Sequence, residues 1–163
     1  MGVPVQRHID NKGLINFRDL GGYTVTDLQG RERQTQWGKV YRAGHFSELS
    51  DEAKQLLMEK NVNTIIDLRS AKEKTRRPND FHDEHDITYV DLDIDPGSSD
   101  SFQSGLAGQA KAENFSKEKG PQIMRDLYRG ILNDYNHLYQ QMFEALLNSA
   151  SHAAVFHCAA GKD

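Results

Sequence analysis

The last nine residues of the chain, 155–163, most constrain its fold. They read Val-Phe-His-Cys-Ala-Ala-Gly-Lys-Asp, so an apolar run leads into a His-Cys pair and small residues follow. This pattern is typical of a buried strand that delivers a nucleophile into a tight loop. In such a loop, successive backbone N–H groups can turn toward an anion and favour the thiolate form of Cys158. The alternative is a buried structural thiol, the usual state of a lone cysteine.

Composition limits the class of protein. The chain has 163 residues, of which 37% are hydrophobic, so it can form one domain with a core but not two of ordinary size. A formal net charge of -4 argues against a nucleic-acid partner. One cysteine excludes an internal disulfide. We find neither a signal-like N-terminus nor a stretch that could span a membrane, and expect a cytoplasmic protein, with secretion left open.

Alternating and β-branched segments predict the strands. We expect strands at 23–25 and 39–42, separated by a polar stretch at 27–36, and further strands at 62–68, 87–94 and 153–156. Residues 97–120 are rich in Ser, Gly, Ala and Lys, and either a mobile lid over the site or a disordered segment without function fits them equally well.

Capping residues and apolar periodicity predict the helices. One helix is expected at 51–60, capped by Ser47 or Ser50, and a capping box at 70–73 opens a short helix that ends before Pro78. An amphipathic stripe from Pro121 to residue 148 predicts two helices that are divided at 133–134. The order of elements predicts an α/β sandwich with a largely parallel central sheet flanked by helices.

Several charged residues are candidates for supporting a site. Arg18 and Asp19 read as an ion pair beside a turn, and a functional role for Arg18 is equally open. Asp67 and Arg69 follow a buried strand, where ligands bind in open α/β sheets, although a structural pair is the favoured interpretation. A basic cluster is either a solvated helix face or a surface that receives an acidic substrate, and it comprises Lys72, Lys74, Arg76 and Arg77. The His and Asp residues at 82–95 match no metal-ligand spacing, so no metal is expected.

Four segments carry a resemblance to a known family. Residues 157–163 match His-Cys-x-x-Gly-Lys-Asp, the start of a signature of the cysteine-dependent phosphatases. Upstream lie Asn-Phe-Arg-Asp-Leu-Gly-Gly at 16–22, Tyr-Arg-Ala-Gly at 41–44, and Asp-Leu-Arg-Ser at 67–70 with Glu73. The chain therefore resembles the bacterial protein tyrosine and dual-specificity phosphatases related to a cyanobacterial dual-specificity phosphatase and the mycobacterial secreted tyrosine phosphatase B.

The resemblance implies a fold, a reaction and a site. It implies the cysteine-phosphatase sandwich and two-step hydrolysis through a cysteinyl-phosphate, without a metal or other cofactor. The substrates would be phosphotyrosine proteins, with phosphoserine, phosphothreonine or phosphoinositide substrates also open. Cys158 would be the nucleophile, His157 would orient the loop, and the phosphate would bind at Ala159, Ala160, Gly161 and Lys162. Asp163 is the first candidate for the general acid, with Asp93 and Asp95 as alternatives.

In the family, the signature continues with an Arg that grips the phosphoryl oxygens, and a helix follows. The sequence ends at Asp163. We therefore expect 1–163 to be a single, C-terminally incomplete phosphatase domain that is nearly inactive. We also expect it to self-associate through the sheet face that the absent helix would cover. The alternative is a catalytically dead phosphate-binding module or an inert fragment.

Overall fold

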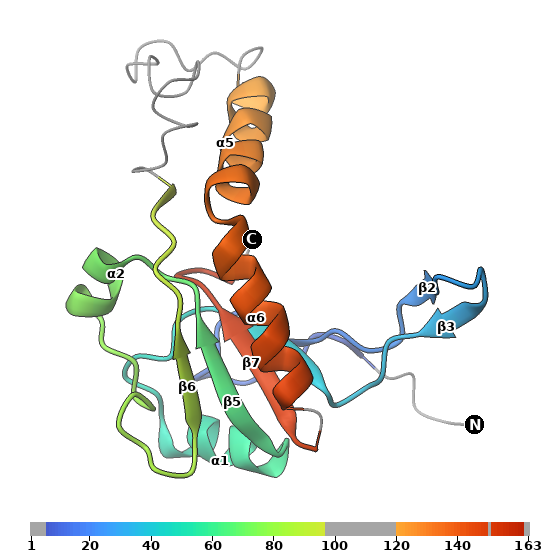
Figure 1. Cartoon of the computed structure of the whole chain (residues 1–163). Helices are drawn as coiled ribbons and strands as arrows, with labels where there is room; N and C mark the ends of the chain where they lie inside the picture. The colour runs from blue at the N-terminus through green and yellow to red at the C-terminus, as the bar shows by residue number, and fades with distance from the viewer. Residues whose placement is uncertain (1–5, 97–119, 150, 162–163) are drawn as a thin grey trace.

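A mostly parallel sheet forms the centre of the computed structural model, which describes residues 6–96, 120–149 and 151–161 (Figure 1). Its five strands lie in the order β1-β4-β7-β5-β6. They are β1 (Arg18–Asp19), β4 (Val40–Ala43), β7 (Ala153–His157), β5 (Val62–Asp67) and β6 (Thr88–Asp91). Strands β4, β7, β5 and β6 are parallel, whereas β1 pairs antiparallel with β4. The predicted α/β class is confirmed.

Helices cover both faces of this sheet. Ile65 and Val155 lie in a core that includes Leu57 of α1 (Asp51–Glu59). The next residues along the same two strands, Ile66 and Phe156, pack instead with Met142 of α6 (Asn136–Asn148). Because successive side chains of a strand point to opposite faces of the sheet, a continuous run of β-branched and apolar residues places apolar side chains on both faces. The result is a three-layer arrangement, with α6 lying across β7 and β5 in Figure 1.

Local sequence signals define the two helices near the site. Ser50 is the N-cap of α1 and accepts a hydrogen bond from the amide of Ala53, and acidic residues occupy the first turn. The short helix α2 (Ala71–Arg76) opens with the expected capping box between Ser70 and Glu73. Helix α2 follows β5 at the carboxyl edge of the sheet, next to the residues after β7.

The predicted amphipathic segment forms α5 (Gly120–Asp134) and α6. The break falls at Tyr135, one residue beyond the predicted division, where the backbone leaves helical geometry with φ -111° and ψ 18°. The excursion expected at 97–120 lies outside the described residues, except for Gly120 in the first turn of α5.

One strand prediction is wrong. The polar stretch at 27–36 contains β3 (Glu32–Gln34), which pairs with β2 (Thr24–Thr26) in a hairpin apart from the central sheet. All six strand residues are exposed, so no apolar alternation marks this hairpin. The strand expected at 87–94 is also shorter, and forms only β6.

Candidate active site

The His-Cys pair lies at the carboxyl edge of the central strand of the sheet. In the strand register, His157 is aligned with Ala43 of β4 on one side and with Asp67 of β5 on the other. Cys158 follows immediately and is half-buried, with its Sγ accepting a hydrogen bond from the backbone N–H of Gly161 at 3.2 Å. The strand and loop predicted around this pair are confirmed.

The four residues of this loop, Cys158 to Gly161, each have a backbone carbonyl group that is held by a hydrogen-bond donor. The four donors, in loop order, are His157 Nδ1 (3.3 Å), the His45 amide (3.3 Å), Asn16 Nδ2 (2.8 Å) and Arg42 Nη2 (2.7 Å). Three of these donors come from segments more than a hundred residues earlier. The loop is therefore held by tertiary contacts.

This anchoring also sets the direction of the loop amides. In a planar trans peptide, the C=O of one residue and the N–H of the next point in opposite directions. With the carbonyls of Cys158, Ala159 and Ala160 held by the surrounding structure, the following N–H groups point away from it, and that of Gly161 reaches the sulfur. The amides of Ala159 and Ala160 have no hydrogen-bond partner among the described residues. This arrangement of amides is suited to an anion beside Cys158.

Gly161 is required for this geometry. Its φ is +67°, in the left-handed region where side chains are disfavoured. A Cβ atom at this position would lie 2.5 Å from the nitrogen of Gly44 and 2.6 Å from the carbonyl carbon of Ala43. The end of β4 therefore fills the space that a side chain would need.

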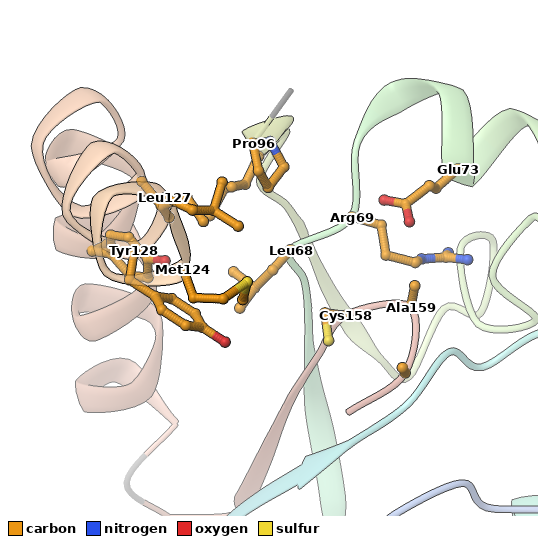
Figure 2. A pocket seen from close by; sticks show the side chains of 13 residues that line it. Leu68, Arg69, Glu73, Pro96, Met124, Leu127, Tyr128, Cys158 and Ala159 are labelled. Carbon is orange, nitrogen blue, oxygen red and sulfur yellow. The ribbon is translucent and has the colours of Figure 1, made fainter. Parts of the chain in front are cut away.

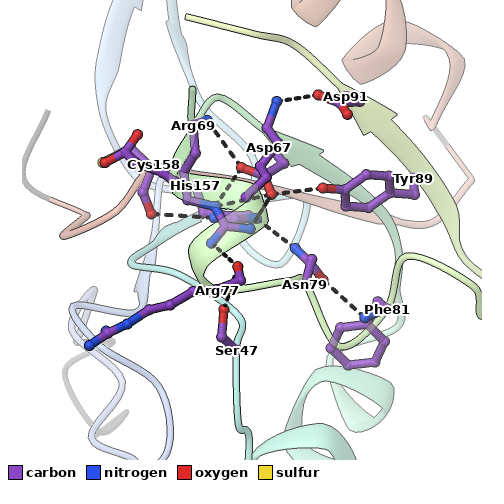
Figure 3. A network of polar contacts seen from close by, with 12 residues as sticks. Ser47, Asp67, Arg69, Arg77, Asn79, Phe81, Tyr89, Asp91, His157 and Cys158 are labelled. Carbon is purple, nitrogen blue, oxygen red and sulfur yellow. Dashed lines mark hydrogen bonds and ion pairs between the residues drawn. The ribbon is translucent and has the colours of Figure 1, made fainter. Parts of the chain in front are cut away.

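Asn79 fixes the state of His157. The Oδ1 atom of Asn79 accepts from the amide of Phe81 at 3.0 Å, so its Nδ2 faces His157 Nε2 at 2.9 Å and donates to it (Figure 3). The imidazole proton must then lie on Nδ1, where it is shared with the Cys158 carbonyl. Burial, together with the positive charge of Arg69, outweighs the opposing effect of Asp67 and lowers the pKa of His157 to about 4. His157 is therefore neutral at neutral pH.

Asp67 and Arg69 form a buried pair beneath the loop. Their side chains are 0% and 1% exposed, and Arg69 Nη2 lies 2.6 Å from Asp67 Oδ2. The hydroxyl of Tyr89 donates to the same oxygen at 2.7 Å. Burial opposes ionisation of Asp67, but the hydrogen bonds from Arg69 and Tyr89, together with the charge that His157 carries below its own pKa of about 4, outweigh it and lower the pKa of Asp67 to about 2. The favoured interpretation of this pair as structural agrees with its burial.

Arg69 also connects the pair to the segment after α2. Its Nη1 donates to the carbonyl of Arg77 at 2.7 Å, and the Ser47 hydroxyl donates to the same carbonyl at 3.0 Å. The side chain of Arg77 extends away from this network in Figure 3. Its Nη1 lies 2.8 Å from His45 Nε2. Because a guanidinium only donates, the His45 nitrogen is the acceptor.

The other candidate residues lie in different places. Arg18 is exposed on β1, and among the described residues it forms no ion pair with Asp19, whose carboxylate accepts from the amides of Gly21 and Gly38. The expected ion pair is therefore wrong. Asp93 accepts from the amide of Ala71 at the start of α2. The carbonyl of Asp95 accepts from the Tyr135 hydroxyl, whereas Lys162 and Asp163 lie outside the described residues.

Two cavities that are lined by described residues border the loop. An apolar cavity of about 260 Å³ lies between Cys158 and α5, and Figure 2 shows Met124, Leu127 and Tyr128 on its far side. A second cavity of about 350 Å³ also borders Ala159 and Ala160, and its polar lining consists of His45, Arg69, Glu73, Arg76 and Arg77. The two cavities adjoin, since both border Arg69, Glu73, Ala159 and Ala160. The lining toward α5 is mainly apolar, whereas the lining toward the end of α2 is basic.

Within the described part of the chain, no group of three or more His, Cys, Asp or Glu side chains could hold a metal ion. The same residues include no helix with the length and hydropathy of a membrane span.

Comparison with known proteins identifies the family. A model of the tyrosine phosphatase family matches residues 9–163. The chain belongs to this family. No curated protein matched it. The phosphatase family match covers the sheet, the helices and the loop after β7 together, so it concerns the whole fold and not the signature alone.

Sequence reasoning missed four residues that hold this candidate site together: Asn16, Arg42, Asn79 and Tyr89. Two of them lie within the quoted motifs at 16–22 and 41–44, which was a signal that their positions matter. Asn79 and Tyr89 carry no such signal, because their partners depend on how the chain folds back.

Proposed function

We propose that this phosphatase hydrolyses phosphotyrosine through a covalent intermediate on Cys158. The observation that supports this proposal most is the hydrogen bond from Gly161 N–H to the Cys158 sulfur, in a loop whose amides point away from the surrounding structure. A thiolate is the nucleophilic form of cysteine, and N–H donors stabilise it. The same donors would hold the phosphoryl oxygens as negative charge develops.

The reaction would have two steps. The Cys158 thiolate attacks phosphorus, an S–P bond forms, and the bond from phosphorus to the substrate oxygen breaks. A general acid gives its proton to that leaving oxygen, and we assign this role to Asp163. Water then attacks the phosphorus of the cysteinyl-phosphate, the S–P bond breaks, and a proton from the water returns to Asp163, which releases inorganic phosphate and restores the thiolate. General acid catalysis of this kind typically contributes about 10² to 10⁴ in rate.

His157 would act as a positioning residue. Its imidazole is buried and neutral, and both ring nitrogens are engaged by Asn79 and the Cys158 carbonyl. A group in this state has no free nitrogen with which to accept a proton from Cys158. Its contribution is to hold the first carbonyl of the loop, and with it the direction of the Ala159 amide.

The apolar cavity supports an aromatic leaving group. Leu68, Met124 and Leu127 line it next to Cys158, and a tyrosine ring would lose exposed apolar surface there. Phosphoserine, phosphothreonine and phosphoinositide substrates remain part of the proposal through Lys162, whose charge in the loop would favour highly charged ligands.

Turnover of p-nitrophenyl phosphate tests the proposal. A chain extended through the Arg and helix of the family signature should hydrolyse it in the presence of a chelator, and residues 1–163 alone should do so far more slowly. In the extended chain, Cys158→Ser should remove turnover while phosphate still raises the melting temperature. If the chain binds phosphate without turnover, it is a phosphate-binding module. Turnover that survives in Cys158→Ser would exclude this cysteine as the nucleophile.

A further inference from the structure

The basic cavity beside the phosphate loop is not used by the proposed reaction. It borders Ala159 and Ala160, so a group bound there would lie next to a phosphate held by the loop. Its wall includes Arg76 and Arg77 at the end of α2, whereas Lys72 of the same helix does not line it. Lys74 forms an ion pair with Asp91. The structure thus divides the basic cluster, and only its two arginines border the cavity.

Arg76 is available to a ligand. It is exposed, and in the described ranges it has neither an ion pair nor a hydrogen bond. Arg77 is held differently, since its guanidinium contacts His45 and its carbonyl is fixed by Arg69 and Ser47. One arginine is therefore free to adapt and the other is prepositioned. Guanidinium groups bind carboxylates and phosphates through paired hydrogen bonds.

The lining carries a surplus of positive charge. Arg69 is neutralised by its buried partner Asp67. Glu73 is the acidic residue of the lining, and its carboxylate accepts from the backbone and hydroxyl of Ser70 in the capping box. It can offset one of the two remaining arginines but not both. An anionic ligand is thus favoured over a neutral one.

His45 is not a source of positive charge in the lining. Burial, followed by the positive charges of Arg77 and Arg69, lowers the pKa of His45, although Glu48 and Asp80 act in the opposite direction. Neither of these carboxylates lines the cavity. His45 therefore serves to hold the Arg77 side chain, and the guanidinium groups supply the positive charge.

We propose that this basic cavity is a second anion subsite, which receives an acidic side chain next to the phosphotyrosine of a peptide substrate. The assignment rests on the proposed function, because the scissile phosphate must lie on the Cys158 loop. A peptide is favoured over an inositol phosphate because the adjoining cavity, which borders Cys158 and α5, has a mainly apolar lining. An aromatic ring fits that cavity, whereas a hydroxylated inositol ring gains little there.

The test measures binding, so it does not depend on turnover. Two labelled phosphotyrosine peptides that differ only in Asp or Asn at the flanking positions are titrated with the full chain carrying Cys158→Ser. The Asp peptide should bind about three- to tenfold more tightly, the range of an accessible charge-assisted contact. Adding Arg76→Ala should abolish this preference. Lys72→Ala removes the same charge from the same helix outside the cavity, and should preserve it.

Each other outcome has a defined meaning. Equal binding of the two peptides, or a preference that survives Arg76→Ala, overturns the subsite and leaves the proposed function intact. A loss in Lys72→Ala as large as in Arg76→Ala shows general electrostatic attraction, and also overturns it. The protein could instead bind an inositol bisphosphate more tightly than an inositol monophosphate, in a way that depends on Arg76, while the two peptides bind equally. That result overturns the peptide subsite and assigns the cavity to a lipid headgroup. Failure of both peptides to bind overturns the proposed function and the subsite together.

Discussion

The side chains of Asn79 and His157 meet at 2.9 Å in the buried interior, and this contact decides which ring nitrogen of His157 carries its proton. Because Asn79 also accepts from the Phe81 amide, its orientation is fixed, and so is the tautomer. The proton on Nδ1 then holds the carbonyl of Cys158. An uncharged residue after α2 thereby influences the first peptide of the loop after β7.

Replacement of Asn79 by Ala should lower the free energy of unfolding by about 1–3 kcal/mol. The change leaves His157 Nε2 and the Phe81 amide buried without their partner, and an unsatisfied buried polar group costs about this much. Urea denaturation at neutral pH measures the loss. The control is Asn148→Ala at the exposed end of α6, which should change stability by less than about 0.5 kcal/mol. Equal effects of the two substitutions would contradict the role of Asn79.

Stability should fall on acidification because His157 is buried in its neutral form. Its pKa is lowered from 6.5 to about 4, so between these values the unfolded chain binds more protons than the folded one. From pH 7 to pH 4.5 this difference should remove about 2–3 kcal/mol of unfolding free energy. His45, whose pKa is also lowered, acts in the same direction. Below pH 3.8, protonation of Asp67, with its pKa of about 2, should remove more.

The contribution of His157 can be isolated by comparing slopes. His157→Gln cannot titrate, so its unfolding free energy should depend less steeply on pH between 6.5 and 4.5, whatever the cost of the substitution at pH 7. Urea denaturation at several pH values gives both slopes. Identical slopes for the two proteins would show that His157 is not held neutral in the fold.

Local signals in the sequence were sufficient for much of the fold. The capping box of Ser70 and Glu73, the β-branched run of β5 and the stripe through α5 and α6 depend on neighbours in the chain, so their elements were predicted. The hairpin of β2 and β3 was missed because it buries no apolar face. It is held by its ladder and by a turn in which Asp27 accepts from the Gln29 and Arg31 amides.

The candidate site was predictable only in part. The His157-Cys158 pair and the small residues after it identify the loop, because the nucleophile and the small residues that allow a tight turn are consecutive in the sequence. The groups that fix the loop are not consecutive. Asn16 and Arg42 reach it from the N-terminal third of the chain, and Tyr89 reaches Asp67 across neighbouring strands. Such contacts depend on strand order and register, which the sequence pattern alone does not define.

Arg42 should matter more to the site than Arg18, although the two residues are direct partners in the β1 and β4 ladder. Arg42 Nη2 holds the Gly161 carbonyl at 2.7 Å, whereas Arg18 is exposed and does not contact the loop. Arg42→Ala should weaken phosphate-dependent thermal stabilisation and reduce turnover by about tenfold or more, as expected for a loss of about 1.4 kcal/mol. Arg18→Ala is the matched control and should change neither. Similar losses in both variants would point to net charge in place of loop anchoring.

Gly161 should be the least replaceable residue of the loop, and Gly30 in the β2–β3 turn provides a close control. Both have positive φ, +67° and +74°, so Ala pays a similar backbone cost of about 1–2 kcal/mol at either position. The surroundings differ, because a Cβ at Gly30 meets nothing within 4 Å whereas one at Gly161 would meet the backbone at the end of β4, with Gly44 N at 2.5 Å.

Gly161→Ala should therefore move the loop, separate its amide from the Cys158 sulfur, and abolish phosphate-dependent stabilisation. Gly30→Ala should lower the melting temperature modestly and leave phosphate binding unchanged. Thermal melts of both variants, with and without phosphate, measure the two effects, and retained phosphate stabilisation in Gly161→Ala would mean that the geometry of this loop does not determine anion binding.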